Sequence, residues 1–148
     1  MDVTIVIPVY RNEETIGRTL TSIDHAWQAA GAPGGLRTIV VVDGIVDSSI
    51  DIIEEWSKVT GVSMTLVVQG NGGVGSARNA GWTRSQSQWV TILEADDEIT
   101  VERLLYAELG PGSNVAYVGC QVVMVDAGHD WDFAVRETAQ GMSIEYID

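Results

Sequence analysis

Three carboxylates stand close together after one strand-like run of the sequence. Glu94, Asp96 and Asp97 follow Trp89–Leu93 directly. Like charges at this spacing destabilise one another's ionised forms unless a counter-charge lies nearby. A hard divalent cation such as Mg²⁺ or Mn²⁺, with its remaining ligands drawn from phosphate oxygens, would supply that charge. The alternative is an acidic turn before a helix, with no ligand. The cluster by itself does not decide between the two interpretations.

A second candidate site is the glycine-rich loop from Gly70 to Gly75. Its first, third and sixth positions are glycine, and the loop follows a strand-like run and opens a helix, as a dinucleotide fingerprint does. Glu94 could then be the acid that binds a ribose. However, the loop follows the third strand rather than the first, and a ribose needs only one acid. A nicotinamide or flavin oxidoreductase therefore stays as a rival hypothesis. The structural alternative is that the loop binds no ligand and has glycines only because its backbone needs positive φ angles.

Two further acids follow the second strand-like run. Asp43 ends it, and its side chain should point into a cleft, where it could accept a hydrogen bond from a base or a ribose. For Asp47 we favour a simpler role as the cap of the next helix.

The chain alternates strand-like and helix-like segments, and these must position the acids and the loop. Four short apolar runs rich in β-branched residues predict buried strands over Val3–Val9, Thr38–Val42, Ser63–Val68 and Trp89–Leu93. Apolar residues at helical spacing predict two helices between them, one with Ile16, Leu20, Ile23, Trp27 and Ala30, the other with Ile52, Ile53, Trp56 and Val59. Further segments are a helix from about Ser76 to Arg84, a helix over Thr100–Leu109, and strands over Val115–Val125 and Phe133–Glu137.

This alternation predicts an α/β fold with a mostly parallel, doubly wound sheet and flanking helices. Ligands of such sheets bind at the carboxyl ends of the strands. Tyr10, Asp43, the Gly70–Gly75 loop and the acidic cluster all follow strands, so they should meet at that edge. This convergence is the main functional signal of the sequence.

Composition narrows the class of protein. The 148 residues carry 21 acidic and 8 basic side chains, a net charge of −13, which disfavours binding to nucleic acid. The sequence has no apolar run long enough to span a membrane and no basic segment before Val3, so it predicts neither a membrane span nor a signal peptide. One cysteine excludes an internal disulfide, and a cytoplasmic location is the expectation.

Four ordered motifs carry a resemblance to a known family. They are VTIVIPVYRNEETI, TIVVVDGIVDSS, QGNGGVGSARNAGW and WVTILEADDEI. Together they resemble the N-terminal, nucleotide-sugar-binding half of the family 2 glycosyltransferases, which have the Rossmann-like GT-A fold. The most specific element comprises Asn71, Gly73, Ala77, Arg78, Asn79 and Gly81.

The resemblance implies a role for each matching position. Pro8, Val9 and Tyr10 would border the nucleoside, and Asp43 would bind the base, usually uracil. Arg78 and Asn79 would lie beside the nucleotide-sugar. Glu94 would face the ribose or the sugar, and Asp96 would bind Mg²⁺ or Mn²⁺ on the diphosphate. The glycine loop would shape the donor pocket.

The sequence also departs from the family pattern. Val42 replaces the first of two adjacent acids, Ile45 and Val46 replace two hydroxyl residues, and Glu94 replaces an aspartate. Such enzymes usually exceed 200 residues and carry a catalytic base in their acceptor half. No such base is recognisable here, although Asp130 and Asp132 are candidates.

We therefore expect one GT-A-like donor-binding domain over residues 1–148. Residues 1–110 would carry the nucleotide-binding motifs, and residues 111–148 would begin an incomplete acceptor-side region. The expected activity is metal-assisted sugar transfer from a nucleotide-sugar, most simply a UDP-sugar, to an unknown acceptor. A non-catalytic nucleotide-sugar-binding module is the alternative that the short length suggests. An exposed sheet edge after Val115–Val125 would favour homo-oligomers.

Overall fold

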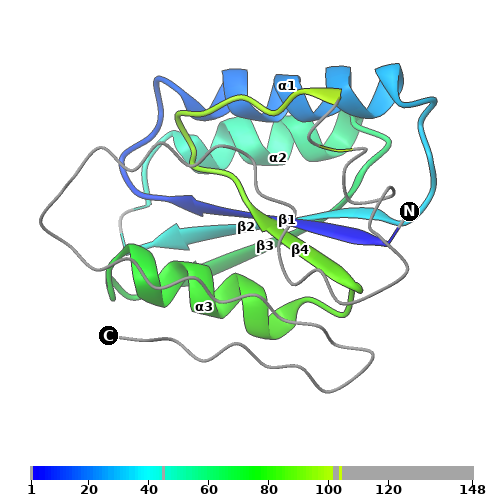
Figure 1. The fold of residues 1–148 in the computed structure, drawn as a ribbon. Coiled ribbons are helices and arrows are strands. Elements are labelled where there is room, and N and C mark those ends of the chain that lie inside the picture. Colours follow the sequence, from blue (N-terminus) through cyan, green and yellow to red (C-terminus); the bar gives the residue numbers. More distant parts are fainter. Residues whose placement is uncertain (1, 45, 102–103, 105–148) are drawn as a thin grey trace, which may run out of the picture.

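The computed structural model describes residues 2–44, 46–101 and 104, and the fold is that of these residues. Strands and helices alternate along the chain (Figure 1). The strands are β1 (Val3–Val9), β2 (Leu36–Asp43), β3 (Ser63–Gln69) and β4 (Trp89–Ile92). The helices are α1 (Ile16–Ala29), α2 (Ser49–Val59) and α3 (Val74–Arg84).

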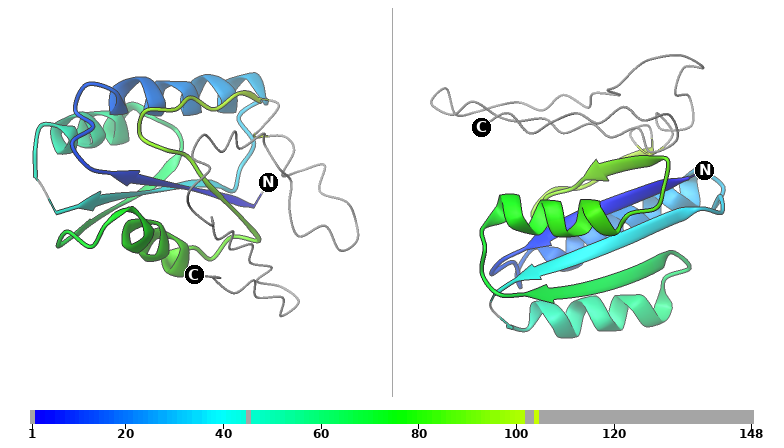
Figure 2. Two further views of the ribbon diagram at one scale, coloured as in Figure 1. Left: turned by 60° about the vertical axis from the view of Figure 1, so that its left-hand side comes forward. Right: turned by 90° about the horizontal axis from the view of Figure 1, so that it is seen from below.

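The four strands form one parallel sheet in the order β3-β2-β1-β4 (Figure 2). At the centre of the sheet, Val6 of β1 lies between Ile39 of β2 and Ile92 of β4. Because all the strands run the same way, their carboxyl ends lie at one edge. The chain adds strands outward from β1 to β3 and then returns to the other side of β1 for β4.

Helices cover both faces of the sheet. α1 and α2 lie on one face and α3 on the other (Figure 1). Alternate residues of β1 serve the two layers: Ile5 and Ile7 join the core beneath α1 and α2, whereas Val6 packs with Ala77 of α3. Both faces of the central strands are therefore buried from solvent, which explains why their sequences are continuous apolar runs.

The approach of α3 to the sheet depends on a glycine. A β-carbon on Gly81 would overlap the side chain of Val6 and lie 3.3 Å from Val41 Cγ2. A larger residue would hold the helix away from β1 and β2, because packed interiors have little room to adjust.

The parallel α/β architecture predicted from the sequence is confirmed, with strand limits shifted by one or two residues. Within α2, Ile53 and Trp56 are buried as predicted, but Val59 is 80% exposed, because this last residue of the helix lies beyond the buried face. Asp47 accepts a hydrogen bond from the backbone N–H of Ser49 (2.8 Å), which agrees with a capping role.

The predicted elements after β4 fall mostly outside the described residues. The N–H of Leu104 donates to the carbonyl of Thr100 (3.1 Å), one turn of the helix predicted there. The predicted strands Val115–Val125 and Phe133–Glu137, and the sheet edge expected to favour homo-oligomers, lie outside. None of the helices in the described part of the chain has the length and apolar character that a bilayer crossing requires.

Candidate functional site

An open pocket of about 380 Å³ lies at the carboxyl edge of the sheet. Residues at or just after the carboxyl ends of all four strands contribute to its wall, as expected from the parallel topology. The lining residues are Pro8, Val9, Tyr10, Asn12, Asp43, Asn71, Gly73, Val74, Ala77, Glu94, Ala95 and Asp96. The convergence of strand ends predicted from the sequence is therefore present in the structure.

Asp43 joins the end of β2 to the glycine loop. Its Oδ1 accepts hydrogen bonds from Nε2 of Gln69 (2.9 Å) and from the backbone N–H of Gly72 (2.8 Å). Burial raises the pKa of Asp43, but hydrogen bonds from Gln69, Gly72 and Gly73 lower it by more, so that the pKa lies below its ordinary value of 3.8. The side chain lines the pocket, yet the residue is only 3% exposed, so Asp43 also supports the structure around it.

The glycine loop fits tightly against the end of β2. Gly44 has a φ of +95°, and a β-carbon there would lie 2.5 Å from Cβ of Asn71. Gly73, with a φ of +86°, stands immediately before α3, and its N–H donates to Oδ1 of Asn71 (3.2 Å). These contacts place the first turn of α3 in the pocket wall, where a helix N-terminus favours an anionic ligand.

The loop does not have the packing of a dinucleotide fingerprint. In that motif the third glycine allows close contact between helix and strand. Here a β-carbon on Gly75 would meet nothing within 4 Å, and neither would one on Gly70. The glycine that brings the helix onto the sheet is Gly81, at the other end of α3.

Glu94 has a counter-charge of its own. Its Oε1 accepts hydrogen bonds from Nε (3.2 Å) and Nη2 (2.5 Å) of Arg78, which extends from α3. Both side chains are partly buried, so solvent screens this pair less than an exposed one. The counter-charge of Glu94 is therefore the Arg78 guanidinium, so this member of the acidic cluster does not need a metal ion to offset its charge.

Asp96 is the acid best placed to hold a metal ion with a ligand. It is exposed, it lines the pocket, and its carboxylate makes no hydrogen bond or ion pair with another described residue. No group of three or more His, Cys, Asp or Glu residues in the described part of the chain could hold a metal ion. Mg²⁺ commonly binds through one or two carboxylates together with phosphate oxygens, and one free carboxylate fits that arrangement.

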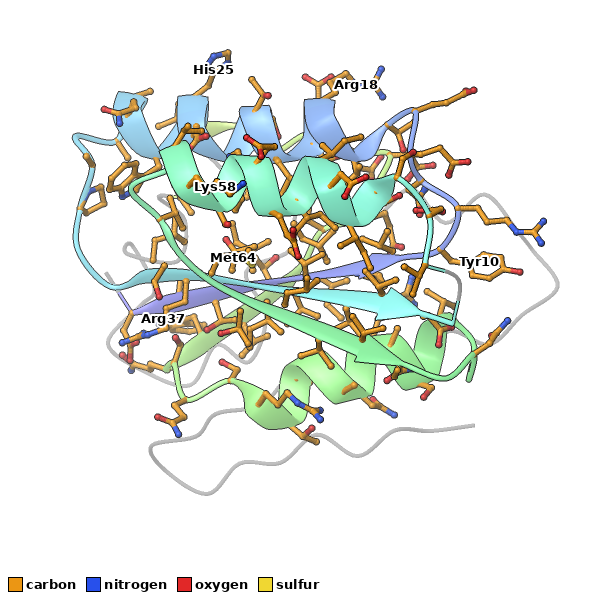
Figure 3. The ribbon with its side chains drawn as sticks, turned by 180° about the vertical axis from the view of Figure 1, so that it is seen from behind. Tyr10, Arg18, His25, Arg37, Lys58 and Met64 are labelled. Carbon is orange, nitrogen blue, oxygen red and sulfur yellow. The ribbon has the colours of Figure 1, made fainter. Side chains whose placement is uncertain are left out.

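The segment after β1 forms the remaining wall. Tyr10 is 44% exposed and projects from the carboxyl edge, whereas Arg37 lies at the opposite edge (Figure 3). The guanidinium of Arg11 lies 5.4 Å from the Tyr10 ring centroid, and Arg11 has a positive φ of 54°. The Tyr10 backbone N–H donates to Oδ1 of Asn12 (2.8 Å), which fixes this turn.

Most of the residues proposed from the sequence thus meet at one pocket. Pro8, Val9, Tyr10, Asp43, Glu94 and Asp96 line it. Arg78 does not line the pocket but donates to Glu94, which does. Asn79 is exposed on α3 and is not part of the lining. Asn12 lines the pocket but was not expected to, although its place just after a strand could have indicated it.

Comparison with known proteins identifies the family. The model of glycosyl transferase family 2 matches residues 4–132. The putative glycosyltransferase EpsH of Bacillus subtilis is 25% identical over 146 residues, which cover 97% of this chain and 41% of EpsH. Glycosyltransferase GlyA of Streptococcus pneumoniae is 30% identical over 97 residues, or 66% of this chain and 13% of GlyA.

Solved structures agree on the fold. TarS of S. aureus in complex with UDP has a TM-score of 0.64 and 25% identity, with 74% of this chain and 31% of TarS covered. The mannosyltransferase PcManGT of Pyrobaculum calidifontis, in complex with GDP-Man and Mn²⁺, has a TM-score of 0.58 and 23% identity, with 65% and 28% covered. These neighbours have the GT-A fold. This chain spans less than half the length of each of these relatives. The pocket, the fold and the match over residues 4–132 lead to one conclusion: the chain belongs to glycosyl transferase family 2.

Proposed function

We propose that this chain is the donor-binding part of a glycosyltransferase that takes a sugar from a UDP-sugar, with the help of Mg²⁺ or Mn²⁺. The observation that carries the proposal is the pocket itself. It brings Asp43, Glu94 and Asp96, from two motifs about 50 residues apart in the sequence, to one edge of the sheet. A nucleotide-sugar has a base, a ribose and a diphosphate, and the pocket offers a different group to each.

The donor nucleotide is proposed from the relatives and from the site. TarS structures contain UDP and UDP-GlcNAc, whereas PcManGT was solved with GDP-Man. The sequence around Asp43 resembles the uracil-binding motif of the family, and for this reason we choose UDP. Since Oδ1 of Asp43 is already bound by Gln69 and Gly72, the base would depend on the remaining oxygen and on the loop that Asp43 holds.

Residues on the two sides of the pocket would orient the rest of the donor. Glu94, fixed by Arg78, would accept hydrogen bonds from hydroxyls of the ribose or the sugar. Tyr10 would form the wall beside the nucleoside. The first turn of α3 would place backbone N–H groups and a favourable dipole near the diphosphate.

Asp96 would hold the divalent ion. When bound, that ion neutralises negative charge that develops on the leaving nucleoside diphosphate. The carboxylate of Asp96 would supply the protein's ligand to the ion, and oxygens of the diphosphate would supply others. The transfer also needs a base to deprotonate an acceptor hydroxyl. Asp130 and Asp132, the sequence candidates for it, lie outside the described residues. The acceptor-side region over residues 111–148 therefore stays a prediction.

Titration calorimetry with UDP tests this proposal. In the presence of Mn²⁺ the chain should bind UDP, and EDTA should abolish most of the heat, because a net charge of −13 opposes a bare diphosphate. Asp96→Asn should lose the Mn²⁺ dependence. Asp97→Asn is the matched control. This substitution removes the same charge one residue away, at a side chain that does not line the pocket. Equal affinity with Mn²⁺ and with EDTA would contradict the metal role, and absence of UDP binding under both conditions would contradict the proposed donor.

A further inference from the structure

The acidic segment after β4 is bound along its backbone by one face of α1. Thr19 Oγ1 donates to the carbonyl of Ala95 (2.9 Å), and Arg18 Nη2 donates to the carbonyl of Asp96 (3.0 Å). Farther along, Ser22 Oγ accepts from the N–H of Ile99 (3.0 Å). Figure 1 shows this segment leaving β4 and running beside α1.

These contacts fix the segment on both sides of Asp96. Thr19 is 0% exposed and Ala95 is 2% exposed, so water cannot replace their hydrogen bond. In addition, the N–H of Asp97 donates to the carbonyl of Glu94 (3.0 Å), which closes a turn around Ala95 and Asp96. The backbone at Asp96 therefore has little freedom, and this backbone determines where the side chain can reach.

Neither Arg18 nor Thr19 lines the pocket, whereas Asp96 does. Their hydrogen bonds to Ala95 and Asp96 are with the backbone carbonyls, so these hydrogen bonds affect a ligand through the position of that backbone. A metal site with a single protein carboxylate depends strongly on where that carboxylate stands, and groups that orient metal ligands typically change metal affinity when they are replaced.

We infer that Thr19 and Arg18 are positioning residues for the metal ligand Asp96. This inference rests on the proposed function, because it requires Asp96 to bind the ion. Thr19 holds the peptide before Asp96 from inside the protein, and Arg18 holds the following carbonyl from the surface. Arg18 also pairs with Glu98 (2.9 Å), which keeps its guanidinium over the same turn.

The experiment measures Mn²⁺ binding at saturating UDP, from the loss of the free Mn²⁺ signal in electron paramagnetic resonance. Thr19→Val keeps the shape of the side chain but removes the donor, and it should raise the Mn²⁺ concentration at half-saturation about 10-fold. Thr19→Ser keeps a hydroxyl and should restore a value near that of the wild type. Thr21→Val is the matched control, because the Thr21 hydroxyl bonds to the carbonyl of Gly17 within α1 and is exposed.

Arg18→Gln provides a second variant, for the case in which Thr19→Val does not fold. Its side chain is 61% exposed, so the fold should tolerate the change, while Mn²⁺ binding should weaken in the same direction. Suppose that Thr19→Val folds. If Thr19→Val and Arg18→Gln both bind Mn²⁺ as tightly as the control Thr21→Val, the inference is wrong, although the proposed function stands. If Thr19→Val does not fold, Arg18→Gln decides in the same way. If the wild type itself binds no Mn²⁺ with UDP, the proposed metal role is wrong and the inference is overturned with it.

Discussion

At the scale of single residues, Asp43 combines two tasks. It lines the pocket, and it accepts hydrogen bonds that hold the glycine loop to the end of β2. A substitution at this position will therefore change stability as well as ligand binding. Alanine would remove the charged acceptor of the Gly72 N–H and of Gln69 Nε2, and a hydrogen bond to a charged group contributes about 1.5–3 kcal/mol.

The acid dependence of stability tests the structural task. The pKa of Asp43 is lowered in the folded state, so its stabilising effect is present at pH values above its unfolded pKa and is lost as the pH falls through the lower, folded pKa. Asp43→Asn should cost about 1 kcal/mol at pH 7, because a charged acceptor is replaced by a neutral one. Urea denaturation should then show the wild type losing more stability than the variant as the pH falls below about 4. If the wild type and Asp43→Asn lost the same amount of stability as the pH fell, the fold would not stabilise the ionised form of Asp43.

The limits of sequence reasoning at this scale are clearest at Glu94. The sequence shows an acid at the end of a strand, and that position was predicted correctly. It does not show that Arg78, 16 residues earlier, turns from α3 toward the same carboxylate. Whether a side chain of α3 reaches the segment after β4 depends on how α3 packs on the sheet. No local sequence pattern encodes that packing. Asn12 was missed for the same reason, since its role depends on the turn around it.

At the scale of elements, the strands were predictable because both faces of the sheet are buried. Continuous β-branched runs then mark each strand, and the stripe of Ile16, Leu20 and Ile23 marks the buried face of α1. The start of α3 was placed two residues late, because the glycine loop gives no apolar periodicity at its junction with the helix. Val59 was assigned to a buried face because periodicity does not reveal where a helix leaves its core.

The seating of α3 can be tested with a pair of glycine substitutions. Gly81→Ala should destabilise the fold by about 1–3 kcal/mol, because the new methyl group overlaps Val6. Gly75→Ala is the control in the same helix. Its β-carbon meets nothing within 4 Å, and alanine favours a helix by up to about 1 kcal/mol, so this variant should be as stable as the wild type or more so.

Thermal or urea denaturation of the two variants would measure this difference. Equal destabilisation by both would show that the glycines act through flexibility of the helix rather than through contact with the sheet. A stable Gly81→Ala variant would show that α3 is seated farther from β1 than the structure indicates.

At the scale of the whole molecule, the family and the fold are established, whereas sugar transfer by this chain is a proposal. The chain covers 41% of EpsH and 31% of the TarS structure with UDP. A positioned base typically contributes about 10²–10⁴-fold to rate, and none is identified among residues 2–44, 46–101 and 104. We therefore expect this chain to bind the donor but to show little transfer in a turnover assay with a broad panel of acceptors. Robust multiple turnover would contradict that expectation and would make Asp130 and Asp132 the first residues to replace. A cytoplasmic location also stays a prediction.

The central claim is that the carboxyl edge of the sheet binds a UDP-sugar. Hydrogen–deuterium exchange of the chain, alone and with UDP and Mn²⁺, tests it most directly. Exchange should slow in peptides covering residues 8–12, 43–44, 70–75 and 94–97. It should remain unchanged at the opposite edge, around residues 35–37 and 61–63. Protection confined to other segments, or the same protection given by NAD⁺ without metal, would contradict the account.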